Sequence, residues 1–109
     1  MHRHVMDLCQ RHDIELISCA RPMDAWADRE HATIGISPIK SNVSYGTALH
    51  ELGHVLGRYH QSRDSLVRER WAWTWARANA LVWNARMERD RRKSLALARR
   101  NRWFRNESS

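Results

Sequence analysis

The sequence has little of what marks fibrous, disulfide-rich or membrane-spanning chains. Its 109 residues include only four glycines, two prolines and two cysteines, while 42% are hydrophobic. This composition excludes collagen-like, low-complexity and mostly disordered chains. Cys9 and Cys19 are too few for a disulfide scaffold and fit a reducing compartment. No run approaches 18 apolar residues, so we expect a cytoplasmic protein that does not associate with membranes.

The positive charge is concentrated at the C-terminal end of the chain. Residues 1–85 carry ten Lys/Arg and nine Asp/Glu, whereas residues 86–105 carry nine Lys/Arg and two Asp/Glu. Almost the whole net charge of +7 therefore belongs to this last segment. A basic helix of this kind is usually a solvated surface. It could also bind nucleic acid weakly, or an acidic partner.

Hydrophobic spacing predicts a small single α+β domain. We expect a short β-sheet packed on one central helix at 43–57, followed by two further helices at 66–84 and 87–104. Alternating residues predict strands at 14–18 and 32–37, and a short helix at the N-terminus buries Val5, Leu8, Cys9 and His12. Because Pro38 ends the second strand, we expect that strand at the edge of the sheet, with Gly35 admitting a neighbouring backbone.

The chemistry-bearing pattern is the H-E-x-x-H run of residues 50–54 inside the predicted central helix. Residues four apart share a helix face, so His50 and His54 can both point at one metal ion. Neutral imidazole suits Zn²⁺. Glu51 follows the first ligand and is placed to accept a proton from a water molecule that the metal activates.

Two residues compete for the third ligand position that a catalytic zinc site needs. His60 completes H-E-x-x-H-x-x-G-x-x-H, the metzincin spacing, with Gly57 allowing the chain to turn. Glu69 lies on a helical stripe with small residues, among them Ala72 and Ala76. Those alanines would let its helix approach the histidine helix closely. We favour Glu69 as the ligand.

The motif in its context resembles a known family. The run S-Y-x-T-A-L-H-E-L-G-H, followed by a helix with E-x-x-A-x-x-W-A, is similar to the ImmA/IrrE family of small bacterial and phage-associated gluzincin-type metallopeptidases. The resemblance covers roughly residues 30–85. It implies that His50, His54 and Glu69 bind zinc and that Glu51 is the general base. It also implies that the strand at 32–37 is an edge strand that aligns an extended peptide substrate.

The combined reading is a zinc-dependent metallopeptidase that hydrolyses a peptide bond in a cytosolic protein, such as a repressor. Residues 1–85 form the peptidase-like part, and residues 86–109 form a basic helix and tail of the same domain. Two alternatives remain open. One is a SprT-like protease that acts on DNA-bound proteins. The other is a non-catalytic basic binding module in which the metal holds the fold together.

Overall fold

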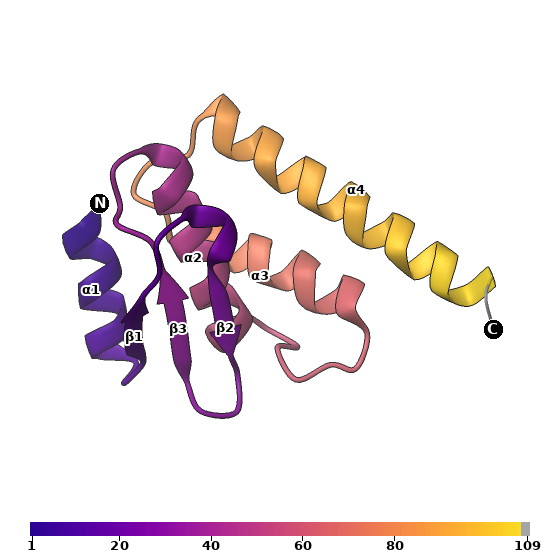
Figure 1. Ribbon diagram of the computed structural model, residues 1–109, viewed down its shortest axis with the longest axis horizontal. Coiled ribbons are helices and arrows are strands. Elements are labelled where there is room, and N and C mark those ends of the chain that lie inside the picture. Colours follow the sequence, from indigo (N-terminus) through magenta and orange to yellow (C-terminus); the bar gives the residue numbers. More distant parts are fainter. Residues whose placement is uncertain (108–109) are drawn as a thin grey trace.

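A computed structural model describes residues 1–107, and the side chains of residues 1–101. It confirms a small α+β domain in which the sheet precedes the last three helices (Figure 1). The elements, in chain order, are α1 (His2–Arg11), β1 (Glu15–Ser18), a short 3-10 turn (Pro22–Asp24), β2 (Trp26–Asp28), β3 (Thr33–Ile36), α2 (Asn42–Leu56), α3 (Ser65–Asn79) and α4 (Ala85–Glu107).

The sheet has the strand order β1-β3-β2, with β1 parallel and β2 antiparallel to β3. β3 is therefore central, and the prediction that it lies at the edge was wrong. Pro38 lies beyond the last paired residue, so its missing N–H removes no hydrogen bond from the ladder. The two edges are taken by β1 and by β2, a three-residue strand that the hydrophobic spacing does not predict.

The predicted role of Gly35 also differs from the structure. A Cβ at this position would lie 2.1 Å from Nε1 of Trp26, so the glycine makes room for the indole ring rather than for another backbone. Ile34 points to the opposite face of the sheet and is fully buried against the helices. The sheet thus has one face on the core and one face partly covered by Trp26.

The three long helices begin at side-chain caps. In α2, Ser41 and Ser44 form a capping box. In α3, Oδ1 of Asp64 accepts a hydrogen bond from the backbone N–H of Leu66 at 3.0 Å. Asn84 caps α4 in the same way, because its Oδ1 accepts from Met87 N–H at 2.9 Å.

The Asn84 cap corrects one predicted boundary. The helix predicted over 66–84 ends at Asn79, and Ala80 adopts an extended backbone with ψ 138°. The chain then reverses so that α4 packs back on α3, and α4 continues past the rest of the molecule (Figure 1).

At the other end of the chain, Val5, Leu8 and Cys9 are buried as predicted, but His12 is exposed beyond the end of α1.

The core is centred on α2. Tyr45, Leu49 and Leu52 are fully buried between the sheet and the other helices. On α3, Ala72 and Ala76 have no exposed surface, which confirms the small-residue contact predicted between these two helices. The approach is close enough that a Cβ on Gly53 would lie 2.2 Å from the carbonyl oxygen of Ala72. This contact sets the distance between the two helices that carry the predicted site residues.

Candidate metal centre

The helical period brings the two histidines of the motif together. His50 and His54 lie one turn apart on α2, and their Nε2 atoms are 3.1 Å from each other. The His50 ring stacks on the indole of Trp73 from α3, with centroids 4.2 Å apart and planes 10° from parallel. Stacking on a buried aromatic ring restricts the His50 side chain and aims its Nε2 at the neighbouring histidine.

Glu69 is brought to the same place by packing between α2 and α3. Its Oε2 lies 2.6 Å from Nε2 of His50 and 3.3 Å from Nε2 of His54. Glu69 precedes Ala72 by three residues, so the close contact at Gly53 also fixes how near this carboxylate comes to α2. The three ligand atoms lie within 4.8 Å of one another, close enough to hold one metal ion.

The electrostatics of Glu69 follow from this arrangement. Burial opposes ionisation of its carboxyl group, but hydrogen bonds and charge attraction from His50 and His54 outweigh it and lower the pKa far below the usual range. The carboxylate is therefore ionised at neutral pH, which is the form that binds a cation.

Glu51 lies beside this group without belonging to it. Its Oε1 is 3.6 Å from Nδ1 of His50, on the side of the ring away from Glu69, and its side chain is only 10% exposed. Burial raises the pKa of the Glu51 carboxyl, His50 and His54 lower it, and Glu69 raises it further, with a net shift upward. A carboxylate whose pKa is raised toward neutrality is a stronger base than an exposed one.

His60, the alternative third ligand, is placed differently. It lies in the turn after α2, where its backbone carbonyl accepts a hydrogen bond from Nη1 of Arg29 at 2.8 Å. Among the described residues the metal-binding group contains His50, His54 and Glu69 but not His60. Gly57 ends α2 with a φ of −68°, and its lack of a Cβ matters because that atom would lie 2.4 Å from the carbonyl oxygen of Gly53.

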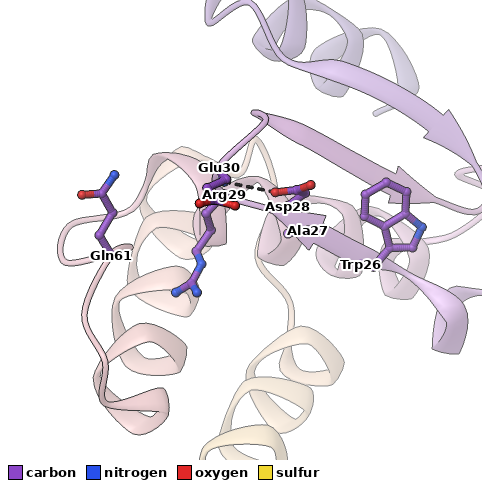
Figure 2. A pocket seen from close by; sticks show the side chains of 6 residues that line it. All are labelled: Trp26, Ala27, Asp28, Arg29, Glu30 and Gln61. Carbon is purple, nitrogen blue, oxygen red and sulfur yellow. Dashed lines mark hydrogen bonds between the residues drawn. The ribbon is translucent and has the colours of Figure 1, made fainter.

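Two hollows lie on this side of the molecule and share two lining residues, and the smaller of them is lined by Glu51 and His54. The smaller one has a volume of about 250 Å³ and is lined by Ala27, Arg29, Glu51, His54 and Arg68. The larger one, about 630 Å³, shares Ala27 and Arg29 with it and is lined further by Trp26, Asp28, Glu30 and Gln61. Figure 2 shows the residues of the larger hollow along β2 and the following turn, with Gln61 facing them from the loop after α2. The edge strand therefore borders the site.

Sequence reasoning missed β2, Arg29 and Arg68 as parts of this site. The strand has only three residues, too few to show a period. The two arginines come from the turn after β2 and from α3, and nothing local distinguishes them from other surface arginines. Adjacency to Glu69 was the only sequence signal available for Arg68.

The basic segment forms one helix, as predicted, and it begins two residues earlier than expected. Met87 and Leu95 are its buried contacts with the rest of the domain. Several of its cationic side chains are exposed, among them Arg86, Arg89, Arg92, Lys93, Arg99 and Arg100. The side chains of residues 102–109 lie outside the described part of the chain.

Within residues 1–107, no helix combines the length and the apolar character needed to cross a membrane. Comparison of the chain with protein-family models, with curated proteins and with solved structures finds no match.

Proposed function

We propose that this protein is a zinc-dependent metallopeptidase of the ImmA/IrrE type, with His50, His54 and Glu69 as ligands and Glu51 as general base. The observation that supports it most is the convergence of these three ligand atoms, from two helices, next to the buried carboxylate of Glu51.

The donor set fits Zn²⁺. Two imidazole nitrogens and one carboxylate oxygen are a common catalytic zinc ligand set. Their separations of 2.6, 3.1 and 3.3 Å approach the roughly 3.3 Å expected between ligands of a tetrahedral ion with bonds of about 2.0–2.1 Å. Three protein donors leave one position for water or substrate, which favours a catalytic ion over the purely structural one of the binding-module alternative.

The catalytic roles of the chain's own residues follow from their positions. When bound, zinc supplies the Lewis acidity that lets a water molecule ionise near neutral pH. Glu51, buried and with a raised pKa, accepts the proton of that water and passes it to the leaving amine. His50 and His54 must be neutral to serve as ligands.

The edge of the sheet next to the site supports the proposal that the substrate is a peptide. In the described part of the chain β2 pairs with β3 on one side and with no strand on the other. Ala27 of this strand lines the same hollow as Glu51 and His54. An extended peptide that paired with β2 would pass its backbone beside Glu51. The substrate-aligning role that the resemblance assigns to residues 32–37 therefore passes to β2. The two free cysteines agree with action in the cytosol.

The test is Glu51→Gln, with the exposed Glu15→Gln as the matched control. Purified proteins are loaded with zinc and incubated with a mixture of internally quenched peptides. Glu51→Gln should bind zinc like the parent but lose about 10²- to 10⁴-fold in hydrolysis, because only the general base is removed. Glu15→Gln should match the parent in both. Parental hydrolysis by Glu51→Gln would contradict the proposal.

The exposed cations of α4 support a second, separate proposal: weak binding of nucleic acid without sequence preference. Labelled DNA titrated at low and moderate salt tests it, because each phosphate contact releases counterions. Replacing Arg89, Lys93 and Arg99 by Gln should reduce the slope of log affinity against log salt by about three. The control variant replaces the same number of cations outside α4, Arg3, Arg11 and Arg63, by Gln. Absence of binding at low salt would refute this role, and proteolysis stimulated by DNA would favour the SprT-like reading.

A further inference from the structure

A third hollow lies outside the sheet, at the N-terminus of α2. Because β1 and β3 are parallel neighbours, the segments that follow them leave the sheet at the same edge (Figure 1). The two segments border a hollow of about 240 Å³ whose lining includes Pro22, Ser37, Lys40 and Ser41. The space outside the carboxyl ends of parallel strands is a common place for ligands in α/β sheets.

The charge around this hollow is positive. Its lining contains the ammonium group of Lys40 and no acidic side chain. Lys40 is exposed and forms no ion pair with the described residues. The first hydrogen bond within α2 runs from the N–H of Tyr45 to the carbonyl oxygen of Ser41 at 3.0 Å, so the N–H groups of Asn42 and Val43 precede the ladder. The dipole of this 15-residue helix adds partial positive charge at the same end.

Ser37 supplies an independent reason to expect a ligand here. The residue is only 6% exposed, yet within the described part of the chain its hydroxyl group has no hydrogen-bond partner. In that same part, the one side-chain N or O atom that is both sealed from solvent and unpaired belongs to Trp73. The Oγ of Ser37 is therefore open to the hollow that the residue lines. A polar group that is nearly buried is stabilised by a partner, and this one faces the space where a ligand would lie.

A second hydroxyl group is left over by the capping box. Oγ of Ser44 accepts from the backbone N–H groups of Lys40 at 2.9 Å and Ser41 at 3.0 Å, and it donates to the carbonyl oxygen of Ser41 at 3.1 Å. These bonds use both lone pairs and the hydrogen of Ser44. Oγ of Ser41, which itself accepts from the N–H of Ser44, is left with its own hydrogen to donate.

We propose that this hollow binds a phosphate group with two negative charges, either free phosphate or the terminal phosphate of a small ester. The donors are the hydroxyl groups of Ser37 and Ser41, the ammonium group of Lys40 and the first N–H groups of α2. Such a phosphate has three terminal oxygens, so it accepts from several donors in different directions. Helix N-termini bind phosphate through the same N–H groups and dipole.

The phosphate site is separate from the metal centre. Ser41 precedes His50 by nine residues, which is about 14 Å along the helix axis. The inference therefore does not rest on the proposed peptidase function, and each can fail without the other.

The experiment follows the amide proton–nitrogen NMR spectrum of the full chain during titration. A chelating resin first removes metal ions, so that phosphate has no ion to bind at His50, His54 and Glu69. The probes are inorganic phosphate, glycerol phosphate and a thymidine dinucleotide with one phosphodiester. Each is compared with sodium chloride of equal ionic strength at about pH 7.5, where a phosphate monoester carries nearly two charges.

The amide signals of Asn42 and Val43 should move with inorganic phosphate and saturate, with a dissociation constant on the order of 1 mM for so small a ligand. Glycerol phosphate that binds at least as tightly identifies an ester as the ligand, whereas binding of inorganic phosphate alone identifies the free ion. Ser37→Ala and Lys40→Gln should each weaken binding about tenfold, because each removes a hydrogen bond to a charged group. Lys40→Arg should retain most of the affinity.

The matched controls are Ser94→Ala and Lys93→Gln, which make the same changes on α4 and should bind like the parent. Signals that do not saturate, that respond equally to chloride, or that keep the parental affinity in both Ser37→Ala and Lys40→Gln would overturn the site. Equal affinity for the dinucleotide would also overturn it, because its phosphate carries one charge. The spread of amide signals shows whether each variant is folded. Lys40 is exposed, so Lys40→Gln keeps the test decisive if Ser37→Ala is unstable.

Discussion

Gly53→Ala should damage both the fold and the metal centre, through the contact between α2 and α3. The added Cβ would lie 2.2 Å from the carbonyl oxygen of Ala72 and 2.8 Å from its Cα, where ordinary contact begins at 3.4 Å. The helices must therefore separate by about 1.2 Å at this point. Both sides of the contact are backbone, so no side-chain rotation can relieve it.

The size of the effect can be worked out from two opposing contributions. Overpacking a tight core contact costs typically about 1–3 kcal/mol, and a backbone contact lies at the upper end of that range. Replacing Gly by Ala within a helix contributes about 1 kcal/mol in the other direction. We expect a net destabilisation of about 2 kcal/mol. Glu69 moves with α3, and metal ligands tolerate displacements of only about 0.2 Å, so zinc affinity should fall at least tenfold.

Gly46→Ala in the same helix is the matched control. A Cβ there would lie 3.4 Å from Cε of Met87, the end of a flexible side chain. We expect this variant to be as stable as the parent or up to about 1 kcal/mol more stable, with unchanged zinc affinity. Urea unfolding of the metal-free proteins gives stability without the contribution of binding. A chromophoric chelator in competition gives zinc affinity. If Gly53→Ala matched Gly46→Ala in both measurements, the reasoning about this contact would be refuted.

Two further predictions concern the ligand set and a surface ion-pair network. Glu69→Ala should lose most of its bound zinc in elemental analysis and His60→Ala little, provided both are folded; the reverse result would favour the metzincin-like arrangement. Hydrogen bonds from Arg91, and then Trp83 and Arg92, lower the pKa of Glu88 to about 2. A lowered pKa stabilises the fold above the unfolded pKa, so Glu88→Gln should cost roughly 1 kcal/mol at pH 7. This difference should shrink between about pH 4.5 and pH 2 in urea unfolding; a difference that does not change with pH would contradict the assignment.

The predictions that the structure confirms depend on short-range geometry. The placement of His50 and His54 on one helix face follows from the helical period alone. The close contact at Ala72 and Ala76 also follows from the local pattern of small residues, and both side chains are buried. The site role of Glu69 and the activity itself remain predictions that the geometry supports.

The predictions that failed concern position within the sheet and the end of one helix. Pro38 indicated an edge strand, but β3 is central because a strand too short to show a pattern occupies the edge. The helix predicted to reach Asn84 ends at Asn79, because Asn84 is used as the cap of α4. In both cases a residue's local preference is compatible with two structures, and packing selects one.

The sequence by itself determined the α+β class, the paired histidines and the candidate base. The class follows from the hydrophobic spacing of each segment, and the histidines and the base follow from the period of one helix, where neighbours in space are near neighbours in the chain. Only the tertiary structure decided that Glu69, rather than His60, reaches the histidines, that β2 borders the site, and that Arg29 and Arg68 share a hollow with Glu51. Such contacts join segments that are distant in sequence, and they depend on how closely the helices and strands pack, down to the missing Cβ of Gly53.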